Sequence, residues 1–240
     1  MRKLVFAALV LLSSLVSFAQ TDTLDTPHKA ASLPHGNDHL MIQLGYTQWA
    51  GRPDTVSTTG IPRSFNMYIM LNFPFRTNKH MSAAIGVGVG SDNMYFKNTD
   101  IRIRDVATAI HFNNVADTSH FKKYKLATSY LEVPVELRFT SKPEDDGHSF
   151  KAALGVKVGV LVSAKTRGRI LLDKAGTTIN DYKEKEASKR FFNSNRISLT
   201  GRVGVGHFSL FSSYQLTTLF KDGMGPVINP LVIGLTVSGL

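Results

Sequence analysis

Alternation of apolar and other side chains dominates the chain after residue 39. In SYLEVPVELRF, residues 129–139, every odd position from Leu131 to Phe139 is apolar, and the even positions include two glutamates and an arginine. The segment NRISLTGRVGVG, residues 195–206, repeats the pattern. Successive side chains of a β-strand point to opposite faces, so a period of two residues is typical of strands rather than helices. The sequence therefore predicts an all-β protein.

Eight segments alternate in this way, and most contain the roughly 9–11 residues that a tilted strand needs to cross a bilayer. Short gaps at 76–80, 141–149 and 206–207 are separated by longer ones. Bacterial membrane barrels place short turns in the periplasm and long loops outside. We therefore expect an eight-stranded antiparallel up-and-down transmembrane β-barrel over residues 39–240, with a periplasmic N-terminus. The expected strands are 39–49, 64–75, 81–95, 124–140, 149–164, 195–206, 208–219 and 229–239, and the long loops are 50–63, 96–123, 165–194 and 220–228.

A soluble barrel would show the same alternation with its apolar face turned inward. The composition of the face opposite the aliphatic one therefore decides between a soluble and a membrane barrel. A face in contact with water carries charge at roughly a quarter to a third of its positions. From residue 82 to residue 90, that face consists of Ser82, Ala84 and three glycines, without any charge. Small neutral residues suit the narrow interior of an eight-stranded barrel. The aliphatic face is therefore expected to contact lipid.

The glycines of AAIGVGVGSD, residues 83–92, also resemble a nucleotide-binding loop at first sight. Such a loop requires a strand, a glycine-rich turn and then a helix. Here Gly86, Gly88 and Gly90 lie inside a strand pattern, and no helix pattern follows them. We interpret them as interior positions of a strand, and no cofactor is expected.

The chain begins with two basic residues, an apolar run and Ser17-Phe18-Ala19, which together indicate a secretory signal peptide over residues 1–19 for export by the Sec route. Residues 20–38 are polar and aperiodic, and we expect a flexible periplasmic leader there. His28, His35 and His39 match no metal-ligand spacing, so no metal site is expected. The chain has no cysteine, which excludes disulfides and a lipid anchor at the cleavage site.

The formal net charge is +10, or 10 − 2 = +8 once Arg2 and Lys3 leave with the signal peptide. Basic charge can indicate nucleic-acid binding, but these bases lie between apolar runs and the chain is exported. Nucleic acid is therefore not an expected partner.

Five charged strand residues share the parity of the small, interior-facing positions. Arginine or lysine facing lipid near the midplane would cost about 2–4 kcal/mol, whereas acids and bases inside a barrel can pair. We therefore predict a polar network that plugs the lumen, although some members could instead lie solvated near a rim. Phe211 also has interior parity, either as a filler of the core or because a bulge shifts the parity there. The five residues are Glu132, Glu136, Arg138, Lys157 and Arg202.

With this strand map, the chain resembles the Bacteroidetes-type outer-membrane β-barrel proteins, often labelled PorT-like. SYLEVPVELRF is similar to their YLEIP strand, and NPLVIGLTVSGL, residues 229–240, is similar to their closing strand. The resemblance implies a location in the outer membrane. It also implies that some relatives are parts of a secretion system, whereas most have no assigned activity.

Two of the long loops carry candidate chemistry. The bases of the loop 165–194 outnumber its acids, so it is a candidate contact for lipopolysaccharide phosphates through Arg167, Arg169, Lys185, Lys189 and Arg190. The alternative is a mixed-charge solubilising loop in which Ile170-Leu171-Leu172 forms a hairpin extension. The loop 96–123 contains a Ser/His/Asp set without any catalytic motif, and a solvated loop is the favoured interpretation. That set is Asp100, Asp105, His111, Asp117, Ser119 and His120.

These features favour a non-catalytic outer-membrane barrel with a plugged lumen and a structural or surface-binding role. Outer-membrane lipid, including lipopolysaccharide, is its expected partner. One alternative is an accessory component of a secretion or surface-attachment system, with protein partners. The other is a lipid-modifying enzyme with its site in the outer loops.

Overall fold

The computed structural model describes residues 40–54, 56–145 and 147–239. The predicted signal peptide, the predicted leader, the three histidines near it and Leu240 lie outside the described residues. Among the described residues, no helix is long and apolar enough to cross a membrane. The strands are β1 (Leu40–Ala50), β2 (Arg63–Pro74), β3 (Met81–Phe96), β4 (Thr99–Asp100), β5 (Asn113–Asn114), β6 (His120–Thr140), β7 (Phe150–Leu172), β8 (Thr178–Ala187), β9 (Asn195–Val205), β10 (Phe208–Gln215) and β11 (Asn229–Ser238).

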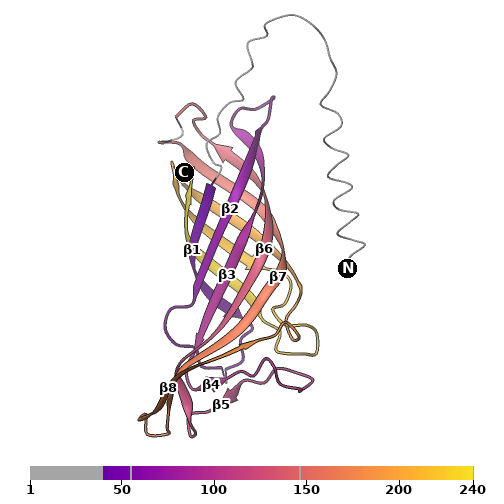
Figure 1. Ribbon diagram of the computed structural model, residues 1–240. Coiled ribbons are helices and arrows are strands. Elements are labelled where there is room, and N and C mark those ends of the chain that lie inside the picture. Colours follow the sequence, from indigo (N-terminus) through magenta and orange to yellow (C-terminus); the bar gives the residue numbers. More distant parts are fainter. Residues whose placement is uncertain (1–39, 55, 146, 240) are drawn as a thin grey trace, which may run out of the picture. The chain divides into compact units, whose positions relative to one another are not determined.

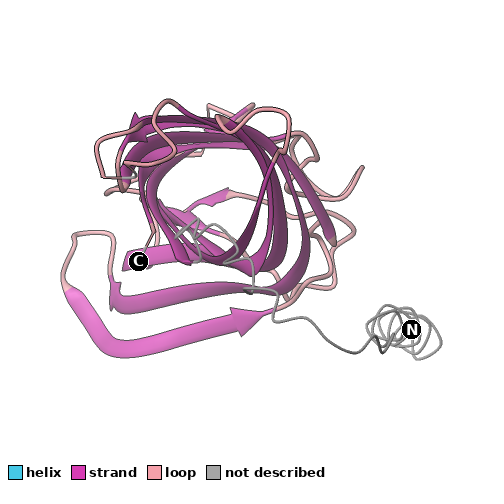
Figure 2. Ribbon diagram, turned by 90° about the horizontal axis from the view of Figure 1, so that it is seen from above, coloured by secondary structure: helices cyan, strands magenta, loops and turns pink. Residues whose placement is uncertain are grey.

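Eight long strands close into an antiparallel barrel, as Figure 2 shows from above. Their order is β6-β3-β2-β1-β11-β10-β9-β7, and the pairing of β6 with β7 completes the ring. The seam between the first and last strands runs from Met41 opposite Ser238 to Ala50 opposite Asn229. Closure leaves no unpaired sheet edge within the ring. The predicted eight-stranded antiparallel barrel is confirmed.

The connections divide the barrel into two ends, which we name the turn end and the loop end. The turn end holds the connections 75–80, 141–149 and 206–207. The loop end holds 51–62, 97–119, 173–177, 188–194 and 216–228. β4, β5 and β8 lie at the loop end, at the foot of Figure 1.

The expected loop 165–194 is the main correction to the strand map. β7 continues to Leu172 and pairs with β8 as a hairpin, and β6 begins at His120 instead of residue 124. The high charge of these extensions hides a strand pattern, because both faces of a strand beyond the lipid are free to carry polar residues. β10 is shorter than expected and ends at Gln215.

The outward face of the barrel is aliphatic and exposed. On β7 this face runs from Phe150 through Val158 to Val162, and its side chains are exposed. At about 3.3 Å per residue and a tilt of about 40°, these 162 − 150 = 12 steps cover about 30 Å along the barrel axis. That height is close to the thickness of the hydrocarbon core of a bilayer.

The inward face is built from small residues where neighbouring strands approach closely. Gly88 lies inside β3, opposite Tyr68 on β2. A Cβ atom on Gly88 would lie 2.0 Å from the backbone oxygen of Met67, so only glycine fits this position. The glycine motif of residues 83–92 is therefore a strand feature.

Candidate functional site

An ion cluster lies at mid-height in the barrel interior, around the fully buried Glu132 of β6. The Lys157 Nζ atom lies 3.3 Å from Glu132 Oε2, and the Arg196 Nη1 atom lies 3.2 Å from Glu132 Oε1. Arg196 Nη1 also lies 2.8 Å from Asp92 Oδ2, and the Tyr68 hydroxyl donates to Glu132. We name these five residues the upper ion cluster.

A second ion cluster lies nearer the turn end, around Glu136. Arg138 Nε lies 2.9 Å and Arg202 Nη2 lies 3.1 Å from Glu136 Oε2. Arg202 also donates from Nη1 to the Ser238 hydroxyl across 3.4 Å, which links β9 to β11. We name these four residues the lower ion cluster.

All five charged residues expected in the lumen are buried, and each takes part in one of these two clusters. The sequence reasoning missed Asp92 and Arg196. Asp92 has the parity of Gly88 and Gly90 on β3, and Arg196 has the parity of Ser198 and Arg202 on β9. Their parity was therefore the available signal. Arg196 is the second residue of β9, where a solvated position is the usual expectation.

Pairing decides whether these buried charges are tolerated. Each charge removed from water costs several kcal/mol unless an opposite charge and hydrogen bonds replace its hydration. In the upper ion cluster, Glu132 and Asp92 balance Lys157 and Arg196, and the Arg196 guanidinium also lies 4.6 Å from the centre of the Tyr130 ring. The cluster thus joins β2, β3, β6, β7 and β9 across the interior.

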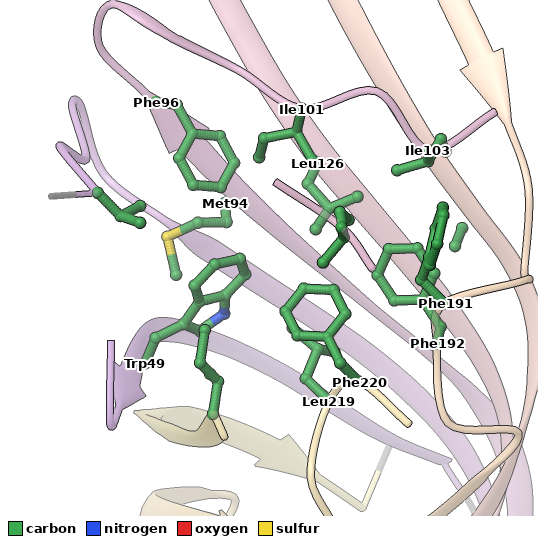
Figure 3. Close-up of a cluster of buried hydrophobic side chains, with 14 of the residues drawn as sticks. Trp49, Met94, Phe96, Ile101, Ile103, Leu126, Phe191, Phe192, Leu219 and Phe220 are labelled. Atoms are coloured by element: carbon green, nitrogen blue, oxygen red, sulfur yellow. The ribbon is translucent and has the colours of Figure 1, made fainter. Parts of the chain in front are cut away.

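Apolar side chains fill the barrel interior at the loop end (Figure 3). The ring of Trp49 lies 5.6 Å from that of Phe96, and Phe192 lies 5.2 Å from Phe220, as distances between ring centres. Ile101 comes from the loop after β4, and its carbonyl oxygen accepts a hydrogen bond of 2.6 Å from a tyrosine hydroxyl of β6. We name this cluster the apolar cap: Trp49, Val56, Met94, Phe96, Ile101, Ile103, Ile110, Tyr124, Leu126, Tyr130, Leu161, Ala164, Phe191, Phe192, Leu219, Phe220 and Ile228.

Phe211 fills space inside the barrel. Its side chain is buried, and its ring lies so close to Gly45 that a Cβ atom there would be 3.1 Å away. β10 pairs with both neighbours without a register shift, so no bulge turns Phe211 inward. Three of the cavities bordered by interior side chains have volumes of about 10 Å³ each, which is space for about one water molecule. A larger cavity of about 580 Å³ is bordered by Arg138, Arg202 and Phe211, and also by outward-facing side chains such as Leu154.

The structure separates the five candidate contacts for lipopolysaccharide into two groups, all of them exposed. Arg167 and Arg169 lie on β7, and Lys185 lies opposite Arg167 on β8. Lys189 and Arg190 follow the end of β8, and Arg190 donates to the backbone oxygen of Asp105 across 3.4 Å.

A β-bulge determines which way the bases of β7 point. Ser129 pairs with Ser163, but the next residue, Tyr130, pairs with Leu161, so β7 contains one extra residue at Val162. An insertion of one residue moves every later side chain to the other face of a strand. Leu161 faces the interior, whereas the odd-numbered Arg167 faces outward. Without the bulge, the bases of β7 would point into the barrel.

The Ser/His/Asp set of the loop 96–123 is not assembled into a triad. Asp100 pairs with Arg102, and Asp117 lies 3.5 Å from Lys174. The ring of His120 contacts the backbone oxygen of Thr118. In the parts of the chain that the structure describes, no group of three or more His, Cys, Asp or Glu is placed to hold a metal ion.

Comparison with known proteins identifies a matching protein family. A family model described as "Outer membrane protein beta-barrel domain" matches residues 41–221. A search of curated proteins found no match. Among solved structures, the chain is similar to Ail, the attachment invasion locus protein of Yersinia pestis, with 13% sequence identity and a TM-score of 0.32 over 84% of this chain and 97% of Ail.

Proposed function

We propose, because the chain belongs to the outer membrane protein beta-barrel domain family, that it is a non-conducting barrel which acts through its surface. In this proposal the turn end and the N-terminus face the periplasm, and the loop end faces outward. Short periplasmic turns and long external loops are the usual arrangement of such barrels. The role is structural or surface-binding, without catalysis.

The observation that carries the proposal is the filling of the interior by three successive layers. The lower ion cluster, the upper ion cluster and the apolar cap follow one another from the turn end to the loop end. An eight-stranded barrel has only enough interior for its own side chains, and here these are large and paired. A hydrated ion would have to break the buried pairs and cross the apolar cap.

Planar bilayer recording tests this proposal. We expect the purified barrel, inserted from detergent, to give no stepwise conductance, because the two ion clusters and the apolar cap occupy the interior at successive heights. An open porin inserted under the same conditions is the positive control. Insertion is checked separately by the mobility difference between unheated and boiled protein on a gel. Reproducible conductance steps from inserted barrel would contradict a plugged lumen.

The other two functions considered from the sequence receive less support. The lipid-modifying enzyme relied on His111 and His120, and neither forms a hydrogen bond with a serine or aspartate side chain in the described parts of the chain. An accessory role in secretion or surface attachment would require a stable protein partner, which a pull-down from detergent extracts would reveal.

A further inference from the structure

Six basic residues form two rows across three neighbouring strands at the loop end. In one row, Arg167 of β7 lies between Lys125 of β6 and Lys185 of β8. In the next row, Arg169 lies between Lys123 and Lys183. Neighbouring strands are about 4.8 Å apart, and successive rows are about 7 Å apart. We name Lys123, Lys125, Arg167, Arg169, Lys183 and Lys185 the basic array.

The two rows share the outward face of the sheet. On β8, Glu186 accepts a hydrogen bond of 3.0 Å from the backbone nitrogen of Ile103, and the Tyr182 ring lies 5.7 Å from that of Phe121. Tyr182 and Glu186 therefore face the apolar cap and its loops. Because strand side chains alternate, Lys183 and Lys185 point outward.

Acidic side chains make few close contacts with the basic array. Like charges directly opposite each other on neighbouring strands are destabilising, and each row places three together. Among the residues that the structure describes, the one acidic side chain within 4 Å of the array is Asp181, which is 4.0 Å from Arg169. Burial, together with the Arg167 and Arg63 guanidiniums, lowers the pKa of Lys125. The array is therefore a surface that a bound anion would stabilise.

The array also lies at a particular height on the barrel. It follows Val162, the last of the exposed aliphatic side chains that start at Phe150, on the same outward face of β7, because of the bulge. Lys125 contacts Asn93 at 2.8 Å and lies over the ring of Tyr95. Tyrosines of membrane barrels typically mark the level where hydrocarbon gives way to headgroups. The array thus begins where lipid phosphates would lie.

We propose that the basic array binds the phosphate groups of lipopolysaccharide in the outer leaflet. This inference rests on the proposed placement of the loop end outside, and it narrows the binding surface from a loop to three paired strands. Guanidinium groups bind phosphate oxygens in pairs, and lysines add point charges around them. Several fixed cations at the lipid boundary match a lipid that carries more than one phosphate. Lys189 and Arg190 lie outside the array and do not contribute.

Equilibrium binding to the full chain in detergent tests the proposal. The variant R167Q/R169Q/K185Q removes three charges from the array, and R76Q/K79Q/K142Q removes three exposed charges from the turn end as a matched control. The probes are lipopolysaccharide, the same lipid after removal of its phosphates, phosphatidylglycerol dispersed in the same detergent, and inorganic phosphate. We expect the Kd of the array variant for lipopolysaccharide to be about tenfold higher or more. A tenfold change in Kd corresponds to about 1.4 kcal/mol of binding free energy, which is shared here among three lost charges. The control and K189Q/R190Q should stay within about twofold of the unmodified protein.

Three results would overturn the proposal: undiminished binding by the array variant, equal binding of the dephosphorylated lipid, or equally tight binding of phosphatidylglycerol or inorganic phosphate. The last result would identify a general phosphate site. Heat-dependent gel mobility confirms that each variant is folded. Conductance and lipid binding are measured separately. A negative binding result would therefore leave the proposal of a non-conducting barrel standing, and a conducting barrel would leave the binding result standing.

Discussion

Replacement of Glu132 by alanine is expected to destabilise the barrel by about 3–5 kcal/mol. The change leaves Lys157 without its carboxylate partner and removes one of the two carboxylates that pair with Arg196. The measurement is urea unfolding of the barrel in lipid vesicles, followed by the shift in gel mobility. Glu144→Ala is the matched control, since Glu144 is exposed in the turn between β6 and β7. The control should change stability by less than about 0.5 kcal/mol.

A double variant separates loss of a charge pair from loss of packing. Glu132→Leu with Lys157→Met removes both charges and leaves Arg196 paired with Asp92. Buried ion pairs can often be replaced by apolar residues of similar volume at little cost, so this variant should be more stable than Glu132→Ala. If Glu132→Ala unfolds at the same urea concentration as the unmodified protein, the upper ion cluster does not hold the strands together.

Replacement of Val158 by arginine is the second large effect that we expect. Val158 is exposed at the middle of the outward face of β7, between Val133 of β6 and Ile197 of β9. An arginine at the midplane of a membrane barrel costs about 2–4 kcal/mol, because its charge must leave water. The same urea titration in vesicles measures the loss of stability.

The control for this variant is Thr177→Arg, at an exposed position between β7 and β8. It adds the same side chain beyond the aliphatic band, and stability should change by less than about 0.5 kcal/mol. Equal stability of both variants would mean that Val158 faces water.

The sequence predicted the parts of the fold that depend on local alternation. Eight segments with a period of two residues were enough for the barrel, its strand count and the interior direction of Glu132 and Lys157. The bulge at Val162 was not predictable from the sequence. Parity is counted along a single strand, whereas a bulge appears only in the pairing of that strand with its neighbour, here β6. The basic array depends on that bulge, and a count along the sequence therefore showed only a basic loop.

The apolar cap was missed for a different reason. Val56, Ile101 and Phe220 come from separate connections and meet only after the barrel has closed. Isolated apolar residues in loops are common and carry no periodicity of their own. Arg196 was missed because the partners that stabilise it, Asp92 and Glu132, lie on strands far away in the sequence.

The central claim is that the aliphatic face meets hydrocarbon while the small and charged residues fill the interior. Because the chain has no cysteine, single cysteines at Val87, Val133 and Val203 can each carry a spin label without background, and Thr177→Cys provides an exposed reference. We expect the three labels, in protein embedded in lipid, to relax strongly with dissolved oxygen and weakly with a water-soluble nickel complex, and the reference to do the opposite. Access of the nickel complex to all three strand positions would contradict the claim.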